Sequence, residues 1–562
     1  MSGVHRPRDC ANWLSRTLPQ LPSPHSGDCY SHSHEIVYGL NTRDRLLAEQ
    51  KRFQHELADV NRLLNGFAPV LRLPIEVLLE VFHCVAPGPS SSERECRSPH
   101  WMILLAVCHH WHDIICATPS FWSRINVFST PRWMKLSLHR SRNVALDVSF
   151  LDHSFPHHDL PALLANHMSR IRTLAFEEVT WDWDESLSKL FHSSMPALER
   201  LAIVNITSGK TCGSINISPA RFPHLRSLKL CRTVVPRDVT SCPKLRVLDL
   251  HNCPLQTSFE ELLTAIKKHT VLEELSLGQS MKGTGGALYL PKPTNKPPIE
   301  LPRLRKLNLR CEYRPIIWHI LNVLRVPNGI DVLVSGDFGD MPTDLDTEFI
   351  MPCLFPGPQT PLTTFPMLSD ITTVQLDLSR TDLTVTAFNA VRRLSFNVYD
   401  HRDRSYHNAL SSCLRDVIKL LHTAPVTSIS ISVGEEERTQ IGVWRTFFAA
   451  FPQLISLSVS GRVDSHSSPM WSVLREIWAQ VSSGANVPCA GLKHIEDDLS
   501  RRIDVVSRLD AITNALECRA QQGTKLERLT LKFPASRKFS TLHDMPQLEQ
   551  LKKWVSDVVV KR

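Results

Sequence analysis

The chain lacks the sequence features that mark membrane, secreted and nucleic-acid-binding proteins. Its longest purely apolar run, Trp101 to Cys108, is far shorter than the ~20 residues that a membrane-spanning helix needs. The N-terminus mixes charged residues with several prolines, so it holds no apolar core of a signal peptide. The 64 basic and 56 acidic side chains are spread along the 562 residues, and their small excess of +8 predicts neither nucleic acid nor a membrane as a partner.

Paired cysteines and converging metal ligands are also missing. The fifteen cysteines form no Cys-x-x-Cys pair and are odd in number, which predicts reduced thiols and a cytoplasmic or nuclear location. His109, His110 and His112 follow Cys108, but adjacent residues of a helix point to different faces and cannot converge on one ion. We therefore expect no metal site.

Motifs of catalytic and nucleotide-binding sites do not occur. The run Gly283-Thr284-Gly285-Gly286 lacks the Lys-Ser/Thr of a phosphate-binding loop, and it precedes a proline-rich stretch. Neither Gly-x-Ser-x-Gly nor His-Glu-x-x-His is present. The sequence therefore predicts a protein that is not an enzyme and needs no cofactor.

The first 68 residues predict a disordered tail followed by a short helix. Residues 1–40 are rich in Pro, Ser and His and show no sustained period. A helix over 41–68 can be capped by Asn41 or Thr42. Its heptad seam, in which Gln50 is the one polar member, consists of Leu46, Phe53, Leu57, Val60 and Leu64. We expect this seam to pack back on the next domain, because so few heptads make only a weak dimer, which is the alternative.

Residues 69–128 predict a small all-α domain. Pro74 suits the first position of a helix, where its missing N–H costs nothing, and Glu76 suits the first turn. Residues 86–100 break the apolar pattern as a loop, and a second helix from Trp101 to about Ala117 is apolar on nearly all faces. This surplus of apolar surface predicts docking onto another protein.

This segment resembles the F-box, whose pattern is Leu-Pro-x-Glu-x-Leu, two residues, Ile/Val-Phe, a Val-Cys-x-x-Trp helix and a terminal Pro-x-x-Trp. The matching residues are Leu73, Pro74, Glu76, Leu78, Val81, Phe82, Val107, Cys108, Trp111, Pro119 and Trp122. The loop of residues 86–100 is longer than in compact F-boxes and looks like the form in families expanded in fungi. His110 and His112 stand where many members have Arg. The resemblance implies that these eleven residues bind a Skp adaptor and, through it, a cullin. Leu73 and Phe82 fit equally well as core residues of the small domain, which is the alternative for each.

The region from 160 to 535 contains an internal repeat whose core is an apolar residue, two others, then Leu-x-apolar. Nine copies begin at Ile171, Leu198, Leu225, Leu245, Leu272, Leu304, Val391, Leu454 and Leu526. From Leu174 onward, the fourth residues of successive copies are 27, 27, 20, 27 and 32 positions apart, as in leucine-rich repeats of irregular length. Each copy predicts a short strand whose leucines point inward, and stacked copies form a solenoid with an open concave surface.

The predicted fold class is therefore α/β: a small all-α F-box followed by an irregular leucine-rich-repeat solenoid. Residues 129–159 are interpreted as a connector, 336–370 as an insertion or a break between two arcs, and 536–562 as a segment that holds a capping helix. In that helix, Leu548, Leu551, Val555 and Val558 follow an amphipathic spacing.

By its resemblance, the chain is expected to be the substrate-recognition subunit of an SCF-type (cullin–RING) ubiquitin ligase, with an unidentified protein as client. The alternative is a repeat scaffold or inhibitor that acts outside any ligase. Mixed charge at the exposed strand positions points to a protein client. The positions expected to line the concave face are Arg226, Lys229, Arg246, Asp249, Glu274, Ser276, Arg305 and Asn308.

Overall fold

The protein divides into two compact units. The computed structural model describes residues 35–85, 100–127, 131–150, 160–179, 190–205, 215, 217–236, 242–255, 259–278, 298–311, 314–327, 329–337, 365–379, 382–399, 409–437, 439–463, 469–479, 489–500, 505–533 and 546–561. The helical unit comprises Met1–Glu93 and His100–Ile115, and the sheet unit comprises Arg94–Pro99 and Cys116–Arg562.

The helical unit contains one long helix and several short ones. Its elements are α2 (Glu35–Gly66), the 3-10 helix η1 (Pro69–Arg72), α3 (Ile75–Val85), the 3-10 helix η3 (His100–Ala106) and most of α4 (His109–Ala117). Pro74 directly precedes α3, as expected for a residue that can start a helix but not continue one. Helix α2 begins at Glu35, six residues before the predicted cap, so residues 35–40 of the tail predicted over 1–40 are helical and that part of the prediction is wrong. The rest of the predicted tail lies outside the described residues.

A small apolar core holds the short helices together. Leu78 and Phe82, one turn apart on α3, are fully buried. The ring of Phe82 packs on Trp111 of α4 with centroids 4.8 Å apart. Ile115 is buried as well, and full burial of such a side chain stabilises a fold by about 1.5–3 kcal/mol.

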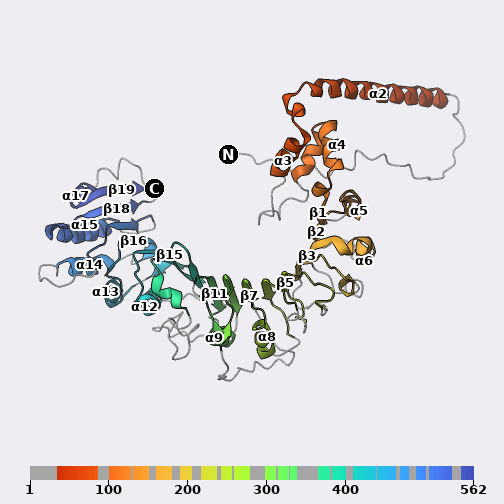
Figure 1. The fold of residues 1–562 in the computed structure, drawn as a ribbon. Helices are drawn as coiled ribbons and strands as arrows, with labels where there is room; N and C mark the ends of the chain where they lie inside the picture. The colour runs from red at the N-terminus through yellow and green to blue at the C-terminus, as the bar shows by residue number, and fades with distance from the viewer. Residues whose placement is uncertain are drawn as a thin grey trace. The chain divides into compact units, whose positions relative to one another are not determined.

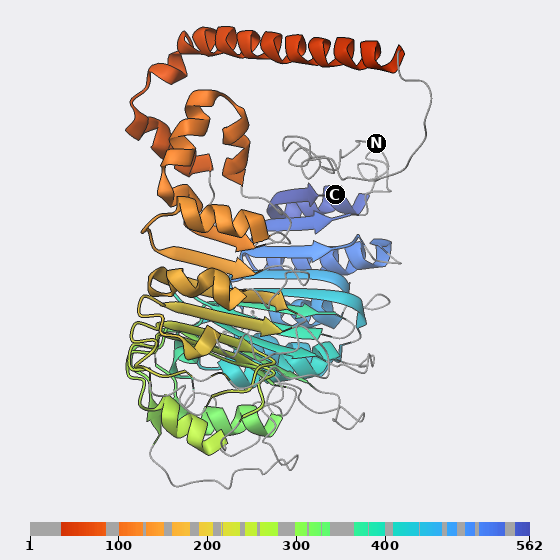
Figure 2. The same cartoon turned by 90° about the vertical axis from the view of Figure 1, so that its right-hand side faces the viewer.

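The sheet unit is dominated by one 17-stranded sheet (Figures 1 and 2). Its strands are β1 (Arg124–Val127), β2 (Leu146–Phe150), β3 (Ile171–Val179), β4 (Arg200–Asn205), β5 (Ser227–Cys231), β6 (Val247–His251), β7 (Glu274–Gly278), β9 (Lys306–Cys311), β11 (Asp331–Asp337), β12 (Thr373–Leu378), β13 (Asp382–Phe388), β14 (Arg393–Tyr399), β15 (Ser428–Glu437), β16 (Ser456–Val463), β17 (His494–Asp498), β18 (Leu526–Lys532) and β19 (Val555–Lys561). Two short strands, β8 (Ile299–Glu300) and β10 (Leu324–Arg325), form a separate parallel pair.

Strands follow chain order across the sheet except at one place. Parallel neighbours run from β1 to β7 and on through β9 to β11. Strand β11 then pairs with β14, followed by β13 and β12, after which β15 to β19 resume the parallel order. Because β13 is antiparallel to both of its neighbours, the segment β12–β14 is an antiparallel meander inserted into a parallel ladder.

The inward leucines of the repeat are in register from strand to strand. Leu201, Leu228, Leu248, Leu275 and Leu307 are successive partners across β4, β5, β6, β7 and β9, and all are buried. All nine predicted copies fall on strands of the sheet, so the repeat pattern is confirmed. The sheet unit is a leucine-rich-repeat-like solenoid in which alternate side chains build the core.

Helices cover one face of the sheet and leave the opposite face open (Figure 1). The helical elements of this unit are η4 (Pro119–Trp122), α5 (Pro131–Arg140), α6 (Leu160–Leu164), η6 (Ala165–Arg170), α8 (Phe259–Ile266), α9 (Arg314–Val323), η8 (Pro366–Asp370), α12 (Ala409–Leu421), α13 (Ile441–Ala450), α14 (Pro469–Ala479), α15 (Val505–Gln521) and α17 (Pro546–Trp554). Their apolar sides pack on the inward strand residues, as with Trp444, Phe447 and Phe448 of α13. The uncovered side is called the open face below.

Three predicted boundaries differ from the structure. The sheet begins at β1 and β2, inside the segments predicted as F-box and connector, because short alternating strands such as Leu146-Asp147-Val148-Ser149-Phe150 lack the repeat signature. The sheet is also continuous past the predicted break at 336–370, most of which lies outside the described residues. The predicted capping helix ends at Trp554, since the β-branched run at 558–560 continues as β19 beside β18.

Candidate protein-interaction surfaces

Exposed apolar side chains concentrate in the helical unit. Among the described residues, 22 large hydrophobic side chains are exposed, and sixteen of them lie between Leu46 and Val107. The short helices contribute Val70, Leu73, Ile75, Val77, Val81, Val85, Ile103 and Val107. Soluble proteins seldom leave this much apolar surface uncovered unless a partner binds there.

Helix α3 carries apolar side chains that the core of the helical unit does not bury. Leu78 and Phe82 face the core, whereas Val77 and Val81 lie one position earlier on the helix and remain exposed to 43% and 44%. Val85 continues the exposed stripe one turn later. The polar residues Glu76 and Glu80 occupy the remaining side of the helix. The exposed valines are therefore accessible to a partner, and they contribute little to the packing of the core.

The structure divides the eleven residues of the F-box-like pattern by exposure. Exposed residues are Leu73, Pro74, Glu76, Val81 and Val107, and partly buried ones are Cys108, Trp111 and Pro119. Leu78, Phe82 and Trp122 are buried, so they support the fold and offer no surface to a partner. Trp122 belongs to the sheet unit, where it packs on Trp133 at 5.4 Å and beneath the guanidinium of Arg140 at 4.6 Å. Sequence reasoning missed the exposed Val77 and Ile75, which the pattern treats as variable positions.

The heptad seam of α2 is uncovered. Leu46, Phe53, Leu57, Val60 and Leu64 are all more than half exposed. The expected packing of this seam on the following domain is thus not realised within the helical unit. The seam is extended by the exposed Leu63 and Phe67 near the end of the helix.

Half of the predicted client-binding residues form one row on the open face. Lys229, Asp249, Ser276 and Asn308 are direct partners on β5, β6, β7 and β9. Glu274 begins β7 and pairs with Lys306, in the neighbouring row. The arginines Arg226, Arg246 and Arg305 lie one residue before their strands and are exposed, so they flank the row and are not members of it.

A polar cluster stabilises this row. The Nε2 atom of His251 lies 2.8 Å from Oδ1 of Asp249 and 3.2 Å from Oγ of Ser276. The imidazole fills the space that Gly278 leaves, because a Cβ there would lie 1.8 Å from Nδ1 of His251. Burial raises the pKa of Asp249, but the hydrogen bond and charge of His251 outweigh it and the net pKa is lowered.

The Asp249–His251–Ser276 cluster does not have the arrangement of a hydrolytic triad. In a triad the carboxylate and the hydroxyl bind opposite nitrogens of the imidazole, so that the base can relay a proton. Here both groups approach Nε2. The cluster is suited to fixing side chains on a binding surface.

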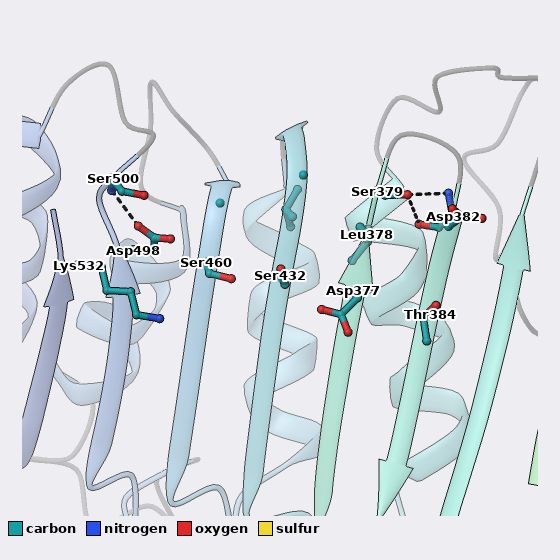
Figure 3. Close-up of a pocket in the computed structure, with 13 residues that line it drawn as sticks. Asp377, Leu378, Ser379, Asp382, Thr384, Ser432, Ser460, Asp498, Ser500 and Lys532 are labelled. Carbon is teal, nitrogen blue, oxygen red and sulfur yellow. Dashed lines mark hydrogen bonds between the residues drawn. The ribbon is translucent and has the colours of Figure 1, made fainter. Parts of the chain in front are cut away.

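A pocket of about 630 Å³ opens on the second half of the open face (Figure 3). It extends from β13 and β12 across β15, β16 and β17 to β18. Its lining consists of Asp377, Leu378, Ser379, Asp382, Thr384, Ser432, Val433, Gly434, Ser460, Gly461, Asp498, Ser500 and Lys532. The volume lies within the range of roughly 300–1,000 Å³ that is typical of ligand sites.

The reversed strand β13 helps to build this pocket. Because β13 runs against β12, its first residues stand beside the last residues of β12, and Thr384 pairs with Asp377. The backbone N–H of Ser379 donates to the carbonyl of Asp382 at 2.8 Å, and the N–H of Asp382 donates to Oγ of Ser379 at 3.0 Å. The meander therefore places two carboxylates, those of Asp377 and Asp382, at one wall.

Small side chains form the floor. Ser432 on β15 and its direct partner Ser460 on β16 line the pocket. The pairs Ser428–Ser456 and Ser430–Ser458 continue the same row of serines outside the lining. At the pocket the next residues are Gly434 and Gly461; the latter has a φ of +93°, and a Cβ there would lie 1.8 Å from the carbonyl oxygen of Val433. No side chain can therefore occupy this part of the floor.

Sequence reasoning missed this pocket, although a signal was present. The alternations Ser428-Ile429-Ser430-Ile431-Ser432 and Ser456-Leu457-Ser458-Val459-Ser460 each predict a strand with one face of serines only. The ragged repeat after residue 335 concealed that these two strands are neighbours. The meander, which supplies the acidic wall, has no leucine-rich signature.

The described residues present neither a cluster of metal ligands nor a helix that could span a membrane. Where residues are described, no group of three or more His, Cys, Asp or Glu side chains is placed to hold a metal ion. His109 forms an ion pair with Asp113 at 2.7 Å, one turn along α4. Within the same part of the chain, no helix combines the length and hydropathy needed to cross a membrane.

Comparison with known proteins gives limited similarity. No protein-family model matches the chain, and no curated protein matches it. An internalin (inlF) from Listeria monocytogenes is similar at 12% identity and a TM-score of 0.23, over 72% of this chain and 88% of that chain. InlP from Listeria monocytogenes is similar at 14% identity and a TM-score of 0.21, over 51% and 90%. TM-scores this low do not establish a shared fold. The leucine-rich-repeat-like character of the sheet unit therefore rests on its own strand order and register.

Proposed function

We propose that this chain is a non-catalytic substrate receptor of an SCF-type ubiquitin ligase. The helical unit would dock on a Skp adaptor, and through it on a cullin, while the open face of the sheet unit holds a client protein. The observation that carries the proposal is the uncovered apolar stripe of Val77, Val81 and Val85 beside the buried Leu78 and Phe82.

The uncovered stripe argues for a protein partner with an apolar groove. Clustered, exposed aliphatic side chains on a rigid helix lose little conformational entropy on binding and gain the full transfer of their area from water. Leu73, directly before α3, and Val107, after η3, add to this surface. The identity of the partner is taken from the resemblance to the F-box. The exposure of Leu73, Pro74, Val81 and Val107, the apolar exposed members of the pattern, supports them as contact residues.

The contribution of such a subunit is proximity. A client held by the solenoid would present its lysines to a ubiquitin-charged enzyme at a high effective concentration, without any catalytic group from this chain. The open face offers the row through Lys229 and Asp249 and the serine-floored pocket as places for the client. Nine described cysteines are free thiols, which suits a location in the cytoplasm or nucleus.

The proposal is tested by co-elution of the intact protein with a purified Skp adaptor on a sizing column. We expect a joint peak for the natural chain and its loss, by at least tenfold in apparent affinity, for Val81→Asp. The matched control is Val391→Asp, because Val391 is 80% exposed and lies in the sheet unit. Separate elution of the natural chain and the adaptor would contradict the ligase role and favour a repeat scaffold or inhibitor outside any ligase.

We further propose that α2 pairs weakly with α2 of a second copy. The seam of Leu46, Phe53, Leu57, Val60 and Leu64 has coiled-coil spacing and is uncovered. An ion pair between Arg52 and Glu56, at 3.2 Å, lies along the helix and leaves this seam free.

A further inference from the structure

We infer that the pocket between β13 and β18 is the client-binding site and that it selects an extended segment carrying two basic side chains. This inference rests on the proposed client-binding role of the sheet unit. It names the chemical class of client, which neither the repeat pattern nor the helical unit defines. The pocket, its charge and the spacing of its carboxylates each contribute to the argument.

The floor of the pocket lacks bulky polar side chains. The two central strands contribute Ser432, Val433, Gly434, Ser460 and Gly461, whereas longer polar side chains such as Asp377 and Lys532 stand at the walls (Figure 3). The hydroxyl of Ser432 can donate to or accept from a peptide backbone, and that of Ser460, which donates to the carbonyl of Ile431 at 3.3 Å, can accept. Since β15 and β16 are each paired on both sides, a bound segment cannot join the sheet as a strand. It must lie across the strands and be recognised through side chains and hydroxyls.

The charge of the lining is negative although the whole chain is positive. Three carboxylates, those of Asp377, Asp382 and Asp498, line the pocket with one ammonium, that of Lys532. Lys532 is paired with Glu496, which lies outside the lining and also approaches Lys561 at 3.9 Å, so its charge is compensated in part. The carboxylate of Asp377 forms no hydrogen bond or ion pair with another described residue. A cationic ligand is therefore favoured.

The carboxylates define a spacing. Asp377 pairs with Ser432, Ser432 pairs with Ser460, and the pairing of Val459 with Asp497 brings Ser460 level with Asp498. Asp377 and Asp498 are thus three strand intervals apart, or about 14 Å at ~4.8 Å per interval. An extended peptide covers the same distance in about four residues, and residues i and i+4 point to the same side. The expected motif is two Arg or Lys residues with three residues between them.

The test is a selection of random 12-residue peptides displayed on phage against the intact protein. We expect enrichment of basic pairs at the i, i+4 spacing with the natural chain and its loss with the double variant Asp377→Asn, Asp498→Asn. The control variant is Asp510→Asn on α15, which removes one exposed carboxylate on the helical face and keeps an acceptor for Gln547. An enriched peptide, labelled with a dye, should bind the double variant at least tenfold more weakly and should weaken as salt is raised.

Peptides without a bias to basic residues, or a bias that the double variant retains, would overturn the inference. Thermal unfolding of both variants separates loss of binding from loss of folding. The selection does not need the adaptor, so it fails or succeeds independently of the ligase proposal. If the adaptor does not co-elute but basic pairs are still selected, only the ligase role is wrong.

Discussion

At the scale of single residues, a buried and an exposed side chain of the F-box-like segment should have separate roles. Phe82→Ala should unfold the helical unit, because removing a buried aromatic side chain costs about 3–5 kcal/mol in a core. Leu73→Ala should leave thermal unfolding nearly unchanged and weaken adaptor binding by about 2 kcal/mol, or roughly 30-fold. Calorimetry together with adaptor titration distinguishes the two effects. Equal losses of stability in both variants would place Leu73 in the core.

Asp497 and Asp498 are neighbours that serve opposite faces of β17. The carboxylate of Asp497 is fully buried and accepts hydrogen bonds from Nε of Arg508 and Nε1 of Trp471, both at 2.9 Å. Both terminal nitrogens of Arg508 are buried without a hydrogen-bond partner among the described residues. Asp497→Asn should therefore destabilise the sheet unit by about 3–5 kcal/mol, since it leaves a buried cation uncompensated.

The matched variant Asp498→Asn should change stability by less than about 0.5 kcal/mol, because this side chain is on the open face. Chemical denaturation of the two variants side by side is the measurement. A similar midpoint for both would show that the buried pair is not a stabilising contact.

Asp147 should confer an acid-dependent part of the stability. Burial raises its pKa, but a bidentate pair with Arg172, at 3.1 and 2.5 Å, outweighs burial and the net pKa is lowered. A carboxylate with a lowered folded-state pKa stabilises the fold above its ordinary pKa of 3.8, and this contribution is lost as the pH falls through the folded-state value. Asp147→Asn should cost about 1.5–3 kcal/mol at pH 7 and progressively less as the pH falls below 3.8. A cost that does not change with pH would contradict the role of the ion pair.

At the scale of elements, α2 is a helix without a covering surface in its own unit. Leu57→Asp places a charge in the centre of the seam and should abolish self-association, because a buried unpaired charge is costly in a coiled coil. Sedimentation velocity over a range of concentrations is the check, with the exposed Glu49→Gln as control. If the natural chain stays monomeric at high concentration, α2 does not pair with α2 of a second copy, and its seam would bind another partner.

Elements with a strong period could be predicted, and those without one could not. The strands with inward leucines, from β3 to β9, were predicted because each copy repeats a local pattern that fixes both strand and face. The strands β12 and β13 were missed, since their pairing depends on a reversal that no local residue pattern specifies. The final helix was predicted too long because Val555 and Val558 fit a helical spacing as well as a strand.

The candidate sites also divide into one that a local sequence pattern predicts and one that no local pattern predicts. The pattern around residue 73 identified the surface of the helical unit, but it could not separate Val81, which is exposed, from Phe82, which is buried. Pocket residues such as Asp377 and Asp498 are 121 positions apart and meet only through the strand order. A concave site assembled from six strands is a property of tertiary structure.

At the scale of the whole molecule, the two units differ in how completely they bury their own apolar side chains. The sheet unit buries a continuous apolar core from Ile125 to Val555, whereas the helical unit holds most of the exposed hydrophobic side chains. Co-expression with the Skp adaptor should raise the soluble yield of the intact protein several-fold, and Val81→Asp should reach the same yield alone. The measurement is the soluble fraction after centrifugation, and an adaptor that brings no gain would contradict the docking role.

The exposed apolar stripe of α3 also affects the fate of copies that a cell makes in excess of the partner. Copies that find no partner present the kind of surface that chaperones and proteases recognise, so they are removed while assembled copies persist. The abundance of this protein would then follow the supply of its partner. Surplus copies would be degraded, so they would not hold clients away from the ligase.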